Sequence, residues 1–371
     1  MNEDQIQYAR RVLGNRSLSS LGFGALTESF GPSQSRHIEE AADALAALKT
    51  GTKLKPAHLY QLESIIVRSG RPVFDVRDDS FLDPGPAWPE LETARALVEA
   101  GIRAVGRVNL GGLPSMPYAG TAFLVATDVL MTNRHVAEFF ATGPGYGRLD
   151  FITGRSATLD FKQEVGSEDS IPLRVVEVLL IHPHWDCALL RVQGMDPPST
   201  PLTLAASTPG DLAGRNVVTI GYPAFNPNPS ENPALQIDIF HGVFQKKRLQ
   251  PGKLIADAVP VTSFGHSVES LTHDCSTLGG NSGSAVLDLG TGQVVGLHFM
   301  GEYLVQNFSV PTWQLALDPR VVDFGVNFSA RPSTPARPTW LEAWQPYLAS
   351  SPGSQSASTE TATRSAAPHL S

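Results

Sequence analysis

The chain has 371 residues, of which 42% are hydrophobic and 8% aromatic, and its formal net charge is −8. This hydrophobic content predicts buried cores, and the length allows two or three domains. The negative charge argues against a nucleic-acid-binding surface, which would need a basic stripe, and no window approaches the roughly 18 consecutive apolar residues of a membrane-spanning helix.

Residues 1–102 have the periodicity of short amphipathic helices. Gly51 is expected to end the first clear helix, in which four apolar residues share one face: Ile38, Ala41, Leu45 and Leu48. Pro56 and Pro89 can each open a further helix, because proline is tolerated in the first helical turn. Such helices bury their apolar stripes on each other or on a neighbouring domain. We therefore expect an α-helical N-terminal extension that serves either as a regulatory or docking element for a partner protein or as packing support.

The pattern changes after residue 102. Up to about residue 328, short β-branched runs alternate with turns rich in Gly, Pro, Asn and Asp at intervals of roughly 10 residues, which is typical of a β-barrel or sandwich. The clearest strand-like runs are 121–127, 172–181, 216–220 and 293–299. A turn-rich stretch at 193–212 divides residues 103–328 into two β domains, 103–205 and 206–328.

One more amphipathic helix is expected within residues 329–349. Its apolar residues are Trp340, Leu341, Trp344, Tyr347 and Leu348. Residues 350–371 are mainly Ser, Thr, Ala and Pro and cannot bury enough apolar surface to offset the entropy lost on ordering. We expect them to form a disordered tail.

The strongest chemical signal is the stretch GGNSGS at residues 279–284, which follows a strand-like run. A nucleophilic serine needs an exposed hydroxyl and a backbone N–H that points at the developing oxyanion. Gly280 and Gly283, on either side of Ser282, allow the tight turn and the close approach of a substrate. An ordinary polar turn is the plain alternative, and the pattern favours Ser282 as a nucleophile.

Two further motifs supply the partners that such a serine needs. His135 follows a strand-like run at 120–125 and a short turn, which is a rigid position for a general base. Asp186 enters an apolar run at 188–190, where a buried carboxylate is costly unless it is paired. A lone histidine after a strand is more often structural than catalytic. Paired with Asp186, however, the imidazole of His135 would be held in one tautomer and stabilised when protonated.

The remaining histidines and cysteines near these motifs have simpler interpretations. His182 and His184 could form a metal-binding pair, but no Cys or further His at ligand spacing accompanies them, so we expect no metal site and no cofactor. Cys187 and Cys275 lie in apolar strand-like runs and are expected to be buried thiols without a disulfide framework. The N-terminus is acidic and lacks an apolar leader segment. These features fit a reduced, cytoplasmic protein.

The three motifs resemble those of trypsin-like serine peptidases, whose nucleophile lies in a Gly-Asp/Asn-Ser-Gly stretch. The GNSGS form is similar to that of the bacterial glutamyl-endopeptidase-like branch. His135, Asp186 and Ser282 occur in the chain order of chymotrypsin, unlike that of subtilisins or α/β-hydrolases. The resemblance covers about residues 103–328. It implies the mainly β chymotrypsin fold, with two six-stranded antiparallel β-barrels and a catalytic cleft between them.

The resemblance also implies a serine endopeptidase that acts on protein or peptide substrates through an acyl-enzyme. His135 would take the proton of Ser282, and Asp186 would orient the imidazole. The backbone N–H groups of Gly280 and Ser282 would hold the oxyanion. Asn281 stands where trypsins carry an Asp that pairs with a freshly cut N-terminal ammonium, and no Ile-Val-Gly-Gly activation site occurs. Both features argue against trypsin-style activation by cleavage.

Specificity is expected from the segment before the serine and from the strand after it. Ser276 stands where trypsin-like specificity would need Asp, so Lys and Arg substrates lose their counter-ion. Thr277 and His298 match the positions whose Thr and His contact the substrate carboxylate in glutamyl endopeptidases, and Phe299 and Gly301 complete the expected pocket. A hydroxyl and an imidazole suit a carboxylate or a side-chain amide. We expect cleavage after an acidic residue, Glu before Asp, with Gln or a small polar residue as the alternative.

Two other functions would use the same scaffold. A non-catalytic binding or signalling module is disfavoured by the complete triad. A serine esterase usually carries its nucleophile in Gly-x-Ser-x-Gly on an α/β sheet, and the stretch around Ser282 lacks that spacing. Activity toward a casein-type substrate and toward a simple ester would separate these functions.

Overall fold

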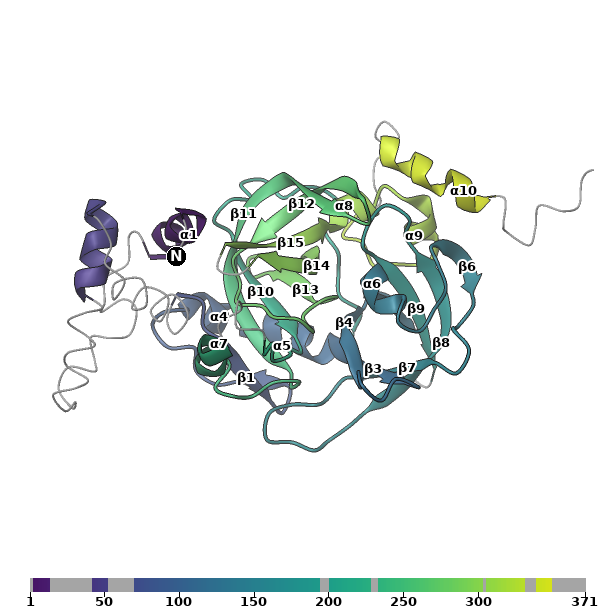
Figure 1. Cartoon of the computed structure of the whole chain (residues 1–371), viewed down its shortest axis with the longest axis horizontal. Helices are drawn as coiled ribbons and strands as arrows, with labels where there is room; N and C mark the ends of the chain where they lie inside the picture. Colours follow the sequence, from purple (N-terminus) through teal and green to yellow (C-terminus); the bar gives the residue numbers. More distant parts are fainter. Residues whose placement is uncertain are drawn as a thin grey trace, which may run out of the picture.

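The computed structural model describes residues 3–13, 42–52, 70–193, 200–227, 233–302, 305–330 and 338–348. Within them, two antiparallel β-sheets close into barrels that lie side by side, with short helices around them (Figure 1).

The first barrel closes through the strand order β8-β7-β3-β4-β5-β9, because β8 also pairs with β9, and β6 adds to β8. Its strands are β3 (Val105–Gly111), β4 (Tyr118–Leu124), β5 (Val129–Thr132), β6 (Gly145–Leu149), β7 (Ser156–Asp160), β8 (Pro172–Ile181) and β9 (Ala188–Gln193). Closure pairs every strand of the ring on both sides and leaves no free edge in it.

The second barrel closes in the same way, through the order β10-β13-β14-β15-β12-β11 and a further pairing of β10 with β11. Its strands are β10 (Asn216–Gly221), β11 (Arg248–Ser263), β12 (His266–His273), β13 (Ala285–Asp288), β14 (Val294–Glu302) and β15 (Gln306–Pro311). Buried Val, Leu and Ile side chains of both barrels belong to one large hydrophobic core cluster.

These two six-stranded antiparallel barrels confirm the predicted fold class. β8 has the predicted bounds, 172–181, and the other three predicted runs overlap β4, β10 and β14. The turn-rich stretch at 193–212 begins at the last residue of β9 and ends before β10, the first strand of the second barrel.

The prediction of an entirely helical N-terminal region is wrong for residues 74–81. β1 (Phe74–Arg77) and β2 (Ser80–Phe81) form a hairpin, and β1 pairs with β11 of the second barrel. Asp78 and Asp79 turn this hairpin with φ of 52° and 59°, the left-handed values that a type I′ turn requires. Asp tolerates this conformation through local hydrogen bonding of its short side chain.

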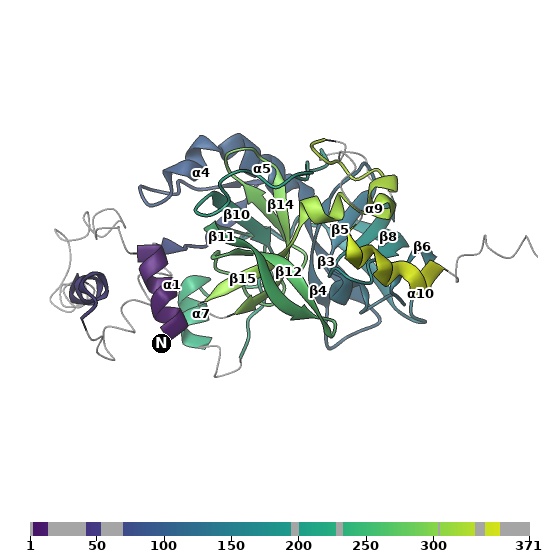
Figure 2. The same ribbon diagram turned by 90° about the horizontal axis from the view of Figure 1, so that it is seen from above.

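Helices α4 (Pro89–Thr93) and α5 (Arg95–Ala104) confirm the helix predicted to open at Pro89. The predicted apolar residues Leu91 and Val98 are fully buried. α5 contacts β10 of the second barrel and β3 of the first (Figure 2). This part of the N-terminal region is therefore packed against both barrels.

Two further helices precede the hairpin, α1 (Glu3–Leu13) and a helix over 42–50. The second confirms the helix predicted to end at Gly51, whose φ is 69°. The helix predicted after Pro56 lies outside the described residues, and so does the predicted tail at 350–371.

The predicted C-terminal helix begins as a 3-10 helix, η5 (Thr339–Trp344), and continues as α10 (Gln345–Leu348). Pro346 accounts for the change, because it lacks the N–H that a continuous α-helix would direct at the preceding turn. Trp344 is fully buried and meets Tyr146 of β6 edge to face, with ring centroids 5.4 Å apart. The remaining helices are α6 (Arg134–Ala137), α7 (Pro233–Ile239), α8 (Thr312–Leu315) and α9 (Pro319–Asp323).

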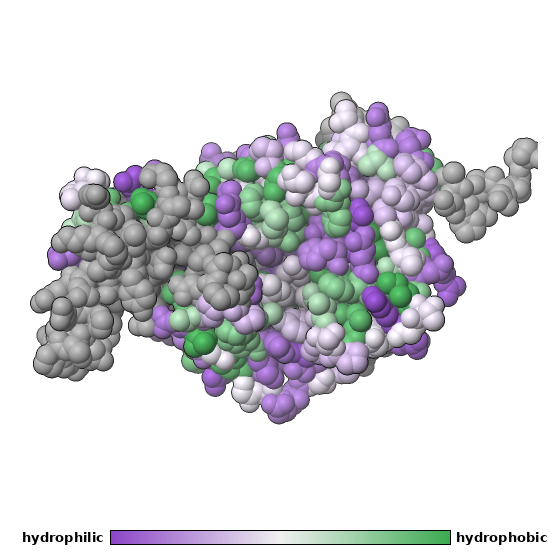
Figure 3. Space-filling model, in the orientation of Figure 1, coloured by the Kyte–Doolittle hydropathy of each residue, from purple (hydrophilic) through white to green (hydrophobic). Residues whose placement is uncertain are grey.

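Hydrophobic and hydrophilic residues are interspersed over the face of the molecule seen in Figure 3. Exposed large apolar side chains such as Leu82 and Phe225 occur singly along the chain, as is normal for protein surfaces. In the part of the chain that the structure describes, no helix is long and apolar enough to cross a membrane.

Candidate active site

His135 and Asp186 are the most closely joined of the candidate catalytic residues. His135 lies in α6, directly after β5, and Asp186 lies in the loop between β8 and β9. Nδ1 of His135 is 2.7 Å from Oδ2 of Asp186, and the backbone N–H of His135 donates to Oδ1 at 3.0 Å. The side chain of Asp186 is 5% exposed and that of His135 is 35% exposed. Nδ1 of His135 is thereby directed at Asp186, and Nε2 is left for another partner.

The loop that carries Asp186 is fixed by His182. Nδ1 of His182 accepts from two backbone N–H groups of the same loop, both at 3.0 Å. Nε2 of His182 lies 3.2 Å from Oδ2 of Asp318, which also accepts from Nε1 of Trp344 at 2.6 Å. Both ring nitrogens of His182 therefore face groups of the protein. Among the described residues, no group of three or more His, Cys, Asp or Glu side chains is placed to hold a metal ion.

Two glycines shape the turn that carries Ser282. Gly280 and Gly283 have φ of 86° and 89°, in the left-handed region that favours glycine. A Cβ at Gly283 would collide with the carbonyl oxygen of Thr121. One at Gly280 would collide with that of Tyr222. Both the backbone conformation and the close contacts therefore require glycine at these two positions.

β4 of the first barrel holds this turn in place. The N–H of Thr121 donates to the carbonyl oxygen of Ser282 at 2.8 Å, and its hydroxyl donates to that of Gly280 at 2.8 Å. β4 pairs with β5, whose end leads into the helix of His135, so these contacts bring Ser282 to the same edge of the first barrel. Within the described residues, the Ser282 hydroxyl makes no hydrogen bond to His135. Such bonds often form only when a substrate is bound.

The same turn presents two unbonded backbone donors. The carbonyl oxygen of Gly279 accepts from the N–H of Ala224 at 2.6 Å. Because the C=O and N–H of one trans peptide point in opposite directions, the N–H of Gly280 points away from Ala224. Neither this N–H nor that of Ser282 has a hydrogen-bond partner within the described part of the chain. Two such donors beside a serine hydroxyl have the composition of an oxyanion hole.

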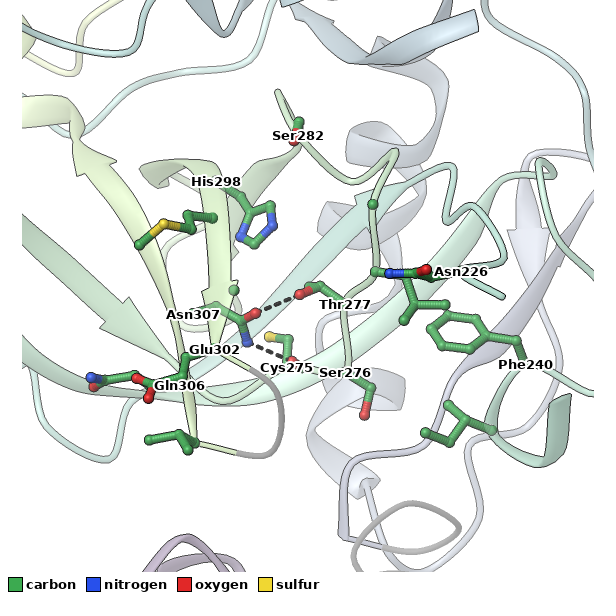
Figure 4. A pocket seen from close by; sticks show the side chains of 16 residues that line it. Asn226, Phe240, Cys275, Ser276, Thr277, Ser282, His298, Glu302, Gln306 and Asn307 are labelled. Atoms are coloured by element: carbon green, nitrogen blue, oxygen red, sulfur yellow. Dashed lines mark hydrogen bonds between the residues drawn. The ribbon is translucent and has the colours of Figure 1, made fainter. Parts of the chain in front are cut away.

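A cavity of about 250 Å³ opens beside Ser282 (Figure 4). Four of the residues predicted for the specificity pocket line it, namely Ser276, Thr277, His298 and Gly301. Phe299 does not, because its side chain belongs to the hydrophobic core. Successive residues of a strand point to opposite faces, so the residue after His298 turns away from the cavity. Phe299 is therefore a core residue and not a pocket residue.

Asn307 of β15 is a lining residue that the sequence reasoning missed. Its Oδ1 accepts from the hydroxyl of Thr277 at 2.5 Å, and its Nδ2 donates to the carbonyl oxygen of Cys275 at 2.7 Å (Figure 4). No local pattern marks Asn307, because it reaches the cavity only through the pairing of β15 with β12 and β14.

A second histidine, His273, lies behind His298 and was also missed. Nε2 of His273 is 3.3 Å from Nδ1 of His298, and the rings meet edge to face. Burial lowers the pKa of His273 to about 3. Burial, together with the neighbouring His273 and His135, lowers the pKa of His298 well below its ordinary value. Both rings are therefore neutral at physiological pH.

One wall of the cavity is held by the N-terminal region. Asp274 is fully buried, and Nε and Nη2 of Arg71 donate to its two carboxylate oxygens at 2.5 and 2.6 Å. The backbone N–H of Lys253 donates to the same carboxylate at 2.7 Å. The hydroxyl of Ser276 donates to the carbonyl oxygen of Arg71 at 2.7 Å. A residue that precedes both barrels thus fixes the segment that lines the cavity.

Residues 120–297 match the family model of the trypsin-like peptidase domain, and His135, Asp186 and Ser282 lie inside the match. Over these residues the chain is similar to trypsin-like peptidase domains. The matched segment begins in β4 and ends in β14, so β3 and β15 complete the two barrels outside it. No curated protein sequence matches the chain.

Solved structures of proteases are similar to this chain. The Rv3671c protease from M. tuberculosis in its active form is 19% identical with a TM-score of 0.43, over 66% of this chain and 92% of that one. Its inactive form is 20% identical with a TM-score of 0.43, over 64% of this chain and 96% of that one. The HtrA-type protease AlgW with a tripeptide is 17% identical with a TM-score of 0.42, over 63% of this chain and 64% of that one.

Proposed function

We propose that the protein is a serine endopeptidase with Ser282 as nucleophile, His135 as general base and Asp186 as the acid that orients the base. One observation carries the proposal. The contact of 2.7 Å between Nδ1 of His135 and Oδ2 of Asp186 lies beside a turn that offers a serine hydroxyl and two unbonded N–H groups. These groups can serve as the nucleophile, the general base, the orienting acid and the oxyanion donors of an acyl-transfer site.

In the proposed reaction, Nε2 of His135 takes the proton of Ser282 as Oγ attacks the carbonyl carbon of a peptide bond. The N–H groups of Gly280 and Ser282 hold the oxygen that becomes negative, and loss of one such donor costs about 3–4 kcal/mol in comparable enzymes. His135 then protonates the leaving amine, and water releases the acyl group by the same steps. Asp186 stabilises the imidazolium that forms in each half of the reaction.

The proposal extends to the side chain that precedes the cleaved bond, which would occupy the cavity beside Ser282. His298 and Thr277 supply polar groups there, and none of the described lining residues is Lys or Arg. Such a cavity suits a hydrogen-bonding side chain better than a large apolar one. The acidic residue expected from the sequence, and Gln as its alternative, both belong to this class.

Ser282→Ala should abolish cleavage of a casein-type substrate and leave the fold intact, because it removes only one oxygen atom. Loss of a triad residue lowers turnover by on the order of 10⁴–10⁶-fold. Asp186→Asn should also lower turnover steeply, because the amide favours the wrong tautomer of His135. Proteolysis and circular dichroism of the two variants measure activity and fold separately.

A simple ester assayed beside casein tests the class of reaction. Hydrolysis of the ester without any peptide cleavage by the wild-type chain would contradict an endopeptidase. Retained cleavage by a clean preparation of Ser282→Ala would overturn the assignment of the nucleophile.

A further inference from the structure

Hydrogen bonds behind the cavity fix the tautomer of His298. Because His273 and His298 are both neutral, each ring carries one N–H and one bare nitrogen. The backbone N–H of Cys275 donates to Nδ1 of His273 at 3.4 Å, which places the proton of His273 on Nε2. This Nε2 faces Nδ1 of His298 at 3.3 Å and is the donor of that bond. The proton of His298 is therefore on Nε2.

His298 offers this N–H to the cavity. Its ring projects from β14 between Ser282 and Asn307 (Figure 4). Within the part of the chain that the structure describes, Nε2 of His298 has no hydrogen-bond partner. The cavity thus contains one directed donor close to the nucleophile.

Thr277 offers only an acceptor. The amide nitrogen of Asn307 donates to the carbonyl oxygens of His273 at 3.3 Å and Cys275 at 2.7 Å, which fixes the orientation of the amide. Oδ1 of Asn307 must then accept, so the hydroxyl proton of Thr277 is used inside the wall. Only the oxygen lone pairs of Thr277 remain for a substrate.

Two arginines close to the cavity wall, Arg71 and Arg11, approach Asp274. Arg71 pairs with Asp274 behind the wall at 2.5 Å. Arg11 of α1 lies at the rim, where it donates to the carbonyl oxygen of Val305 at 2.7 Å and approaches Asp274 to 3.8 Å. The described lining residues include Glu302 and no Lys or Arg. A carboxylate in this cavity would meet only neutral donors among the described lining residues, together with the like charge of Glu302, and burying an ion without a cationic partner is costly.

A primary amide has both an acceptor and a donor, and each can pair with one of these two groups. Its carbonyl oxygen can accept from Nε2 of His298, and its NH₂ can donate to the oxygen of Thr277. We propose that the cavity selects the side-chain amide of glutamine over the carboxylate of glutamate, and that His273 is the positioning residue that enforces this choice through the tautomer of His298. This inference rests on the proposed endopeptidase function and specifies its substrate class.

The first test compares peptides that differ only in the residue before the cleaved bond, with Gln, Glu, Ala, Arg or Phe at that position. We expect the full-length chain at neutral pH to cleave the Gln peptide with a kcat/KM roughly 10- to 100-fold above that of the Glu peptide, the range that an unmatched charged group imposes. Faster cleavage after Glu, Arg or Phe would overturn this inference and leave the endopeptidase function standing. No cleavage of any peptide, with no reaction of Ser282 with a fluorophosphonate, would overturn both.

The second test separates His273 as a positioning residue from His273 as a packing residue. His273→Gln keeps an N–H that can donate to Nδ1 of His298, whereas His273→Leu removes it. We expect His273→Leu to raise KM for the Gln peptide by a larger factor than for the Ala peptide, and His273→Gln to retain the wild-type preference. A folded His273→Leu variant with the wild-type ratio of Gln to Glu cleavage would contradict the role of His273.

The ring nitrogens of His298 give a readout that does not depend on turnover. In ¹⁵N spectra, we expect a bare Nδ1 and a protonated Nε2 in the wild-type chain and in His273→Gln, and loss of this pattern in His273→Leu. A protonated Nδ1 in the wild-type chain would overturn the inference even if His273→Leu fails to fold.

Discussion

Asn281 is a buried neutral residue beside Ser282, the proposed nucleophile. Its side chain is fully buried, and its Oδ1 accepts from Nε2 of Gln250 at 3.2 Å. An Asp at this position, as in trypsins, would need a cation to compensate its charge, whereas Asn needs only hydrogen bonds. Within the described part of the chain, the turn around Gly280 and Ser282 has its two N–H groups unbonded while the residue between them is neutral.

Asn281→Asp should destabilise the protein, because it places a carboxylate in the core next to the hydrogen-bond donor Nε2 of Gln250 without adding a cation to balance the new charge. The effective penalty of an unpaired buried ion is about 3 kcal/mol or more, and urea unfolding at neutral pH would measure it. Lowering the pH should restore part of the lost free energy of unfolding, because the carboxyl group is neutral once it is protonated. A variant as stable as the wild type would show that the site already contains a compensating charge.

The residues of the candidate site differ in how far the sequence could predict them. His135, Asp186 and Ser282 lie in short patterns whose neighbours, a strand end or a glycine turn, explain why each residue type is there. His273 and Asn307 lie in strands and reach the cavity only through pairing across the second barrel, so their local sequence carries no sign of it.

The hairpin and helices before the barrels are packed as parts of the two-barrel domain. β1 extends the second barrel through β11, and α5 lies against both barrels. Nζ of Lys247 donates to the carbonyl oxygen of Ile102 at 2.8 Å, which fastens the end of α5. Of the two roles expected for the N-terminal region, these contacts favour packing support for residues 70–104.

Arg71→Ala should lower the free energy of unfolding by about 3–5 kcal/mol, because it leaves the buried carboxylate of Asp274 without its bidentate partner. The matched control is Arg71→Ala combined with Asp274→Asn, which removes the charge as well. We expect the double variant to be more stable than the single one in urea unfolding. Equal stability of the two would contradict a buried ion pair as the link between this segment and the cavity wall.

Removal of the segment tests its role more directly. A chain that begins at Gly101 loses β1, Arg71 and most of α5, and we expect it to be insoluble or unfolded. A chain that begins at Gly70 keeps all of these and should fold and retain peptidase activity. Soluble yield, circular dichroism and casein cleavage compare the two. Unchanged folding and activity of the shorter chain would show that the hairpin and α5 are dispensable.

The hairpin also shows why the element prediction failed there. Asp-Asp is a weak turn signal compared with Asn-Gly, and each strand is short, so the local pattern does not indicate a hairpin. The strand β1 is stabilised by β11, which lies far away in the sequence. Longer runs such as β8 carry their own apolar pattern over a full strand and were predicted with their observed bounds.

Histidines with lowered pKa values in both barrels should make the stability of the fold depend on pH. Burial lowers the pKa of His182 and His184, in the loop of Asp186, with His184 reaching about 4. Burial likewise lowers the pKa of His273 to about 3 and that of His298 well below its ordinary value. In an unfolded chain, each histidine would take up its proton near pH 6.5. Between that pH and the folded values, the unfolded state binds more protons than the folded state.

The free energy of unfolding should therefore be constant through neutral pH and fall as the pH drops below about 6.5, by up to about 1.4 kcal/mol per pH unit for each such histidine. Urea unfolding from about pH 8 to about pH 5 would measure this dependence. His273→Gln removes one of these four histidines. It should reduce the slope of the free energy of unfolding against pH by up to about 1.4 kcal/mol per pH unit, the contribution of one proton. His241→Gln, at an exposed position, is the matched control and should follow the wild type. A midpoint that stays constant down to about pH 5, or an equal slope in His273→Gln, would show that these histidines are already protonated in the folded protein.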